Sequence, residues 1–166
     1  MLPLSQRIST LDRFRYRVAE KKDFLARTLT QEVGKPITQS HNELKGLLGR
    51  LEFFLHNVQK ATIEETVFQE SGVTEQIAHE PLGTIVNISA WNYPYFVGRN
   101  VFYPGLLTGN AVLYKPSEFA SLTGVAIHEM MVESGVPKEL FPVIIGGPSM
   151  GAELLKQPAD GVFFTG

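Results

Sequence analysis

The 166-residue sequence contains no cysteine, which excludes disulfides, thiolate metal sites and a cysteine nucleophile within these residues. It has no apolar run of about 18 residues, the length that a membrane span needs, and its first residues lack the apolar core of a signal peptide. The net charge is only -2, without a basic stripe, so nucleic acid is not an expected partner. These absences leave an ordinary globular protein, with the cytosol as the default compartment.

Histidine is also scarce, and no metal site is expected. The four histidines are His41, His56, His79 and His128. None of them stands at ligand spacing from another histidine, and no cysteine is available to complete a site. We therefore interpret them as surface or core residues.

The N-terminal part is rich in apolar residues at helical spacing. Residues 4–60 carry two such stripes, which predict two long amphipathic helices. Gly34-Lys35-Pro36 separates them, because glycine tolerates a left-handed exit and proline cannot continue a helix. A coiled-coil interaction module is the alternative, although the spacing is not a clean heptad. We assign residues 1–63 to this helical part.

Residues 64–80 differ in composition. Ser71-Gly72 lies between two runs rich in Val, Thr, Ile and Phe, a pattern typical of a β-hairpin. The alternation of apolar and polar residues is weak, so both faces of the hairpin are expected to be exposed. Strands of this kind can extend a neighbouring sheet.

Residues 81–166 contain four short apolar runs separated by helical stretches at about 95–107, 121–134 and 148–156. The runs are 84–88, 111–114, 141–145 and 162–164. Buried strands that alternate with helices predict repeated βαβ units and a parallel sheet. The fold class is therefore α/β: a helical pair, a hairpin arm, and a Rossmann-like parallel βαβαβαβ half-domain.

Polar or glycine-rich stretches follow each predicted strand, and they meet at the carboxyl edge of the sheet, where open α/β folds bind ligands. Lys115-Pro116-Ser117-Glu118 offers a cation and a carboxylate that suit the phosphate and ribose of a nucleotide. A solvated loop with a helix-capping serine or glutamate is the alternative.

Two further loops lie at the same predicted edge. Gly146-Gly147-Pro148 leads into a helix, where small residues favour phosphate, although a plain turn explains it equally well. Ser89-Ala90-Trp91-Asn92 holds the only tryptophan, and an asparagine amide at a helix start can donate to a developing oxyanion. Alternatively, Trp91 and Tyr93 plug the end of the core.

The order of these segments resembles the aldehyde dehydrogenase superfamily over nearly the whole chain. The similar segments are Glu32-Val33-Gly34-Lys35-Pro36 (E-x-G-K-P), Trp91-Asn92-Tyr93-Pro94 (P-W-N-[FY]-P), Gly109-Asn110 with Lys115-Pro116-Ser117-Glu118 (G-N-x-V-x-x-K-P-S-E), and Phe164-Thr165-Gly166 (the start of F-T-G-S). Ala90 replaces the proline that usually precedes the tryptophan, which loosens one turn.

The resemblance implies roles for individual residues. Asn92 corresponds to the amide that donates to the oxyanion of the thiohemiacetal intermediate, and Lys115 and Glu118 to residues that hold the adenosine ribose of NAD. The other implied cofactor-binding residues are Ile88, Ser89, Ala90, Trp91, Ser117, Gly147, Gly151, Thr165 and Gly166. A carboxylate at Glu118 repels a 2′-phosphate, so NAD is favoured and NADP is possible.

The resemblance also implies what is missing from these residues. The catalytic cysteine and the general-base glutamate of the family both follow F-T-G-S. We therefore expect part of an enzyme that oxidises an aldehyde to a carboxylic acid, inactive alone, with exposed apolar surface at the final strand. The hairpin implies a dimer or tetramer of the intact enzyme. The alternative is a remnant that binds a nucleotide or a partner without catalysis.

Overall fold

The computed structural model describes residues 2–166, and it begins with three helices where the sequence predicted two. They are α1 (Leu4–Glu20), α2 (Lys22–Val33) and α3 (Ile37–Thr62). The predicted first helix is interrupted at Lys21, whose φ of -91° and ψ of 12° leave the helical range. The bend turns the apolar stripes of both α1 and α2 toward one core, and neither glycine nor proline marks it in the sequence.

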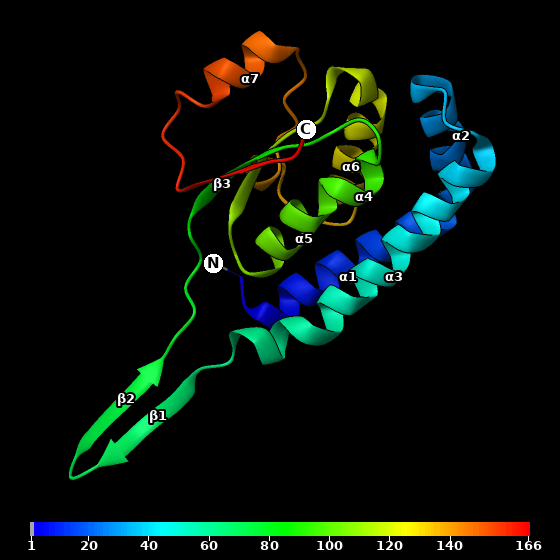
Figure 1. Ribbon diagram of the computed structural model, residues 1–166. Helices are drawn as coiled ribbons and strands as arrows, with labels where there is room; N and C mark the ends of the chain where they lie inside the picture. The colour runs from blue at the N-terminus through cyan, green and yellow to red at the C-terminus, as the bar shows by residue number, and fades with distance from the viewer. Residues whose placement is uncertain (1) are drawn as a thin grey trace.

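The second predicted boundary lies where glycine and proline place it. Gly34 has a φ of 71° and ends α2, with its N–H donating to the carbonyl of Thr30. Pro36 then precedes the first turn of α3. This tight connection makes α2 and α3 antiparallel neighbours, as Figure 1 shows.

The hairpin forms as the sequence predicted. β1 (Glu65–Glu70) pairs antiparallel with β2 (Val73–Ile77). Between them Ser71 and Gly72 have φ values of 50° and 83°, the two positive angles of a type I′ turn that matches strand twist. Every residue of both strands is exposed. The hairpin projects away from the rest of the chain (Figure 1).

A parallel sheet of three strands forms the centre of the C-terminal part. Its order is β4-β3-β5, with β3 (Thr84–Ile88) between β4 (Ala111–Lys115) and β5 (Gly161–Phe164). The strand predicted at 141–145 is wrong: only Val143 forms a bridge, to Tyr114 of β4. Pro142 has no N–H to donate to a ladder, so the pairing stops after two backbone hydrogen bonds.

The helices between the strands lie close to their predicted positions, with one correction. The stretch predicted as one helix at 95–107 consists of α4 (Pro94–Val97) and α5 (Arg99–Leu107), joined at Gly98. A Cβ at Gly98 would lie 3.0 Å from both Ser89 Oγ and the Tyr114 ring, so the junction depends on close approach to the sheet. The remaining helices are α6 (Ser121–Glu133) and α7 (Pro148–Leu154), with short 3₁₀ turns at Glu118–Ala120 and Lys138–Leu140.

One continuous core joins the N-terminal helices to the sheet. Buried residues from α1, α2 and α3 contact those from α5, α6 and β4. In Figure 1, α5 and α6 lie between the sheet and the N-terminal helices, and α7 lies on the other side of the strands. The helical part and the sheet therefore stabilise each other through this shared core.

Among the described residues, none of the helices is both long and apolar enough to cross a bilayer.

Candidate functional site

A cavity of about 580 Å³ opens where β3, β4 and β5 end. Its walls come from four separate stretches of chain, each following a strand or belonging to α7. The sequence-predicted residues that line it are Ile88, Ser89, Ala90, Trp91, Asn92, Lys115, Ser117, Glu118, Gly151, Thr165 and Gly166. Phe119, Pro148, Ala152, Leu155 and Phe164 complete the wall. The fold therefore brings together nearly every predicted site residue at one edge of the sheet.

Gly147 is the predicted residue that does not line this cavity. It lies at the N-terminal boundary of α7 with extended backbone, and a Cβ there would meet nothing within 4 Å. Gly151, one helical turn on, lies against the stem of Lys115, with Cε 3.7 Å from the position of an added Cβ. Of Gly147 and Gly151, only Gly151 therefore approaches the site closely.

Lys115 ends β4 inside the protein. The residue is only 3% exposed, and its Nζ donates to the neighbouring carbonyl of Pro116 at 3.3 Å. An ammonium group has three donors, so this contact leaves capacity for a further acceptor in the cavity. Lys115 thus supplies a buried cation at the end of β4, beside the central strand β3.

The loop after Lys115 combines a cap with a carboxylate. Ser117 Oγ accepts from the backbone N–H of Phe119 at 3.3 Å, so the capping role that the sequence left open is present. The same hydroxyl donates to Glu118 Oε2 at 3.4 Å. Glu118 itself is exposed at the cavity wall. Capping and ligand binding are therefore compatible in this loop.

The aromatic side chains of the loop after β3 do not fill the end of the hydrophobic core. Trp91 and Tyr93 are 52% and 50% exposed, which excludes that alternative. Asn92 Oδ1 accepts from the backbone N–H of Tyr93 at 3.0 Å, so the side-chain oxygen faces the chain and Nδ2 is the donor that remains. Asn92 lines the cavity, as an oxyanion donor must.

Beneath this loop lie two buried hydroxyls. Ser89 Oγ and Tyr114 Oη are buried, and neither has a hydrogen-bond partner among residues 2–166. Burial raises the pKa of Tyr114 well above its ordinary value, which keeps the phenol neutral. Ser89 forms part of the cavity wall, whereas Tyr114 does not line the cavity.

The first charged residue of the Glu32–Pro36 segment reaches the start of α6. Glu32 Oε1 accepts from the N–H of Leu122 at 2.5 Å, and Oε2 accepts from the N–H and hydroxyl of Thr123 at 2.9 and 2.8 Å. A carboxylate at a helix N-terminus satisfies free donors and the helix dipole. Glu32 therefore holds the helix that follows the Lys115–Glu118 loop.

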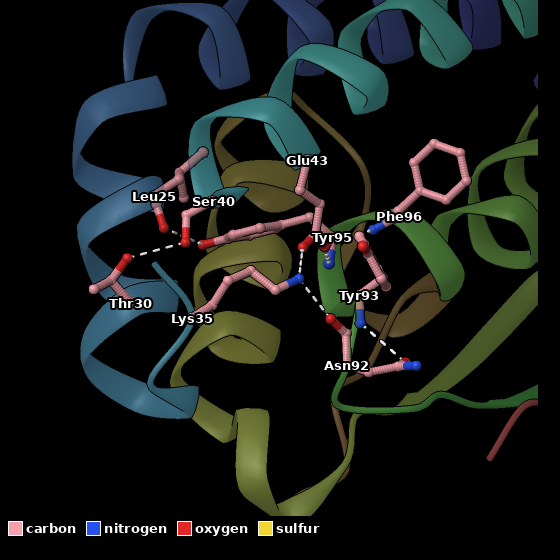
Figure 2. A network of polar contacts seen from close by, with 9 residues as sticks. All are labelled: Leu25, Thr30, Lys35, Ser40, Glu43, Asn92, Tyr93, Tyr95 and Phe96. Atoms are coloured by element: carbon pink, nitrogen blue, oxygen red, sulfur yellow. Dashed lines mark hydrogen bonds and ion pairs between the residues drawn. The ribbon is translucent and has the colours of Figure 1, made fainter. Parts of the chain in front are cut away.

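The second charged residue of that segment forms an ion pair that sequence reasoning missed (Figure 2). Lys35 Nζ lies 2.6 Å from Glu43 Oε2 and donates to the Asn92 carbonyl at 2.5 Å. The available signal was the position of Glu43 in the stripe of Ser40, Leu44 and Leu47, all buried on α3. A carboxylate on the buried face of a helix needs partners there.

Groups of three or more metal-binding side chains do not occur among residues 2–166. The chemistry at the cavity consists instead of one cation, one carboxylate, one amide donor and aromatic surface. A donor set of this kind can form hydrogen bonds and stacking contacts with phosphate, sugar hydroxyls and a flat ring.

A profile of the aldehyde dehydrogenase family matches residues 1–166. The N-succinylglutamate 5-semialdehyde dehydrogenase of Sphingopyxis alaskensis is 28% identical over 165 residues, which cover 99% of this chain and 34% of that protein. The chain thus spans about a third of the length of this relative.

Solved structures give the same result. Betaine aldehyde dehydrogenase from Staphylococcus aureus, in complex with NAD+, superimposes with a TM-score of 0.82 at 27% identity, over 89% of this chain and 30% of that one. Succinic semialdehyde dehydrogenase from Streptococcus pyogenes, in complex with NADP+, shares the fold with a TM-score of 0.86 at 18% identity, over 96% and 34%. With the profile match over its full length, the chain belongs to the aldehyde dehydrogenase family.

Proposed function

We propose that this chain forms the cofactor cleft and the oxyanion donor of an NAD(P)-dependent aldehyde dehydrogenase. The observation that carries the proposal is the convergence of Asn92, Lys115 and Glu118 on one cavity at the carboxyl edge of a parallel sheet. Family membership supports the same reaction class. In the intact enzyme the aldehyde becomes a carboxylic acid through a thiohemiacetal on a cysteine.

The residues of the cavity fit a nicotinamide dinucleotide. The Lys115 ammonium and the Glu118 carboxylate can hold the two hydroxyls of the adenosine ribose, with Ser117 fixing the carboxylate. Gly151 leaves room beside the lysine stem. The bound dinucleotide supplies a hydride acceptor. Thr165 and Gly166 lie in the wall near the expected pyrophosphate, with Ile88, Ser89, Ala90 and Trp91 along the end of β3.

Glu118 favours NAD over NADP. A 2′-phosphate would place negative charge beside its carboxylate, and like charges at short distance repel. The relatives whose structures contain NAD+ and NADP+ share the fold. We infer a preference for NAD rather than exclusion of NADP.

Asn92 stabilises charge that develops on the substrate oxygen. Its Oδ1 is engaged by the backbone, which directs Nδ2 outward as a fixed donor, and such donors lower the barrier because they are oriented before the reaction. The nucleophile is not among these residues, since the sequence has no cysteine, and the family resemblance implies that the general-base glutamate also follows them. The chain alone is therefore expected to oxidise no aldehyde.

The hairpin is the proposed oligomerisation element of the intact enzyme. Its apolar side chains are exposed, Val67 at 51% and Val73 at 54%, and its outer edges are unpaired within the described part of the chain. An isolated two-stranded hairpin is marginally stable in water. We infer that β1 and β2 dock on another copy in a dimer or tetramer.

A remnant that binds a nucleotide or a partner without catalysis is the second candidate. The lack of cysteine together with a well-formed cavity favours it. The two candidates differ in whether the intact gene product forms NADH from NAD and an aldehyde.

Titration of the chain with NAD, followed by the fluorescence of Trp91, tests the cleft. We expect saturable binding, weakened at least about tenfold in Lys115→Met, because one charge-assisted hydrogen bond contributes roughly 1.5–3 kcal/mol. Lys156→Met is the matched control, since the Lys156–Glu153 pair is exposed. Equal NAD affinity in Lys115→Met and the wild type would refute the assignment of Lys115.

A further inference from the structure

Lys35 connects the turn between α2 and α3 to the loop after β3. Its side chain is 10% exposed, and its ammonium makes three contacts. It pairs with Glu43 Oε2 at 2.6 Å, donates to the Asn92 carbonyl at 2.5 Å, and lies 3.8 Å from the centre of the Tyr93 ring. All three groups are drawn in Figure 2. One cation thus touches the backbone of Asn92 and the side chain that follows it.

Glu43 holds the other end of the same loop. Its side chain is fully buried, and Oε1 accepts from the N–H groups of Tyr95 and Phe96 at 2.8 and 3.2 Å. Both N–H groups lie in the first turn of α4, where backbone donors lack intrahelical partners, and the Phe96 N–H also donates to the Tyr93 carbonyl at 3.0 Å. Glu43 therefore caps α4 from a different helix, immediately after the Asn92 turn.

A third bond fixes the loop to α2. Tyr95, which is 1% exposed, donates its hydroxyl to the Leu25 carbonyl at 3.1 Å. The backbone from Asn92 to Phe96 is thereby held at its carbonyl, its N–H groups and a buried side chain. The Asn92 side-chain nitrogen is not held by any of these bonds, and its orientation follows from the bond between Asn92 Oδ1 and the Tyr93 N–H.

We propose that Lys35 and Glu43 are positioning residues for Asn92. They act through the backbone of the Asn92–Phe96 turn, and they keep the amide Nδ2 in one orientation at the cavity. This inference rests on the proposed oxyanion role of Asn92. A donor contributes most when its supporting shell holds it before substrate binds.

A role in stability alone predicts something different. Thr30 and Ser40 also join α2 to α3, through a hydrogen bond of 3.0 Å, drawn in Figure 2, and within residues 2–166 neither one is hydrogen-bonded to Asn92 or Tyr93. Thr30→Val removes this bond at nearly constant shape. Lys35→Met keeps a similar stem and removes only the ammonium. Both substitutions weaken the α2–α3 connection, but only Lys35→Met removes the hydrogen bond to the Asn92 carbonyl.

The test is the NMR signal of the Asn92 side-chain amide in the 166-residue chain, identified by its absence in Asn92→Leu. The wild type and Thr30→Val should show a resolved, narrow pair of amide protons. Lys35→Met should lose that pair to broadening or averaging, while far-UV circular dichroism stays unchanged. An unaltered pair in Lys35→Met would overturn the proposal.

Glu43→Gln provides the second variant if Lys35→Met does not fold. It retains shape and one acceptor for the α4 donors, and it removes the charge that fixes Lys35. Loss of the resolved Asn92 pair in this variant supports positioning, and retention of the pair overturns it.

Kinetics of the intact enzyme separate this proposal from the function on which it rests. Asn92→Ala should lower kcat about a hundredfold, the loss typical of one oxyanion donor. Lys35→Met should lower kcat by about tenfold with KM unchanged, because a misplaced donor is weakened and not removed. Unchanged kcat in Asn92→Ala would refute the oxyanion role, whereas the NMR result still decides whether Lys35 orders the side chain.

Discussion

Replacing Glu32 by alanine would remove the acceptor of three hydrogen bonds at the start of α6. Two of the donors belong to Thr123, which is fully buried. The third donor, the N–H of Leu122, is exposed and can bond to water. The two buried donors of Thr123 are therefore left without a partner, whereas the exposed Leu122 N–H can replace the lost bond with one to water.

The expected cost follows from these contacts. An unsatisfied buried donor costs about 1–3 kcal/mol, and the lost carboxylate near the positive helix end costs about 0.3–1 kcal/mol. We expect Glu32→Ala to lower the free energy of unfolding by about 3 kcal/mol in total, since the Thr123 hydroxyl can rotate toward another acceptor. At this chain length the loss corresponds to a decrease in Tm of roughly 6–12 °C.

Urea unfolding followed by far-UV circular dichroism measures the effect. Glu153→Ala is the control, because Glu153 pairs with Lys156 at 2.6 Å on the exposed surface, and exposed pairs contribute about 0–1 kcal/mol. Glu32→Gln should fall between the two, since it keeps one carbonyl acceptor. A loss in Glu32→Ala no larger than in Glu153→Ala would refute the capping role.

Three further outcomes are expected. Gly124→Ala should lower Tm, because the new Cβ would overlap the Pro116 ring and overpacking of about 1–3 kcal/mol exceeds the gain in helix propensity. Gly49→Ala, with nothing within 4 Å of the new Cβ, should raise Tm in the same thermal unfolding experiment. Burial raises the pKa of Glu43, so the folded chain binds its proton more tightly than the unfolded chain. The stability of the wild type relative to Glu43→Gln should therefore increase as the pH falls through about 4.3 in urea titrations, and a difference independent of pH would contradict this. Ser71→Asn should slow amide hydrogen exchange in the hairpin, because Ser71 holds a φ of 50° that asparagine adopts more readily; faster exchange would contradict the turn assignment.

Most of the sheet and its connections could be predicted because their signals are local. Buried strands at 84–88 and 111–115 are short apolar runs, and Gly34 marks a helix end through its own conformation. The bend at Lys21 could not be predicted in this way. It exists because α1 and α2 must both face one core, and no residue at the bend prefers it. The failed strand at 141–145 is apolar, but Pro142 stops its ladder.

The site residues also divide into those with a local signal in the sequence and those that depend on how the helices pack. Lys115, Glu118 and Asn92 follow strands in the sequence, so topology alone places them together. Glu43 has its partners at Tyr95 and Phe96, more than fifty residues later. Its position on the buried stripe of α3 indicates that it has partners, but not which ones. Residues that support a site from another helix are recognisable only once the helices are packed.

The central position of β3 determines when the cavity can be completed during synthesis. β3 pairs on one side with β4, which follows soon after it, and on the other with β5, which leaves the ribosome after every helix of this chain. Thr165 and Gly166, which complete the wall, emerge later still. A nascent chain therefore exposes one edge of β3 while its helical core is already available to fold. Until β5 pairs, the unpaired edge of this central strand is open to chaperones and to other nascent chains.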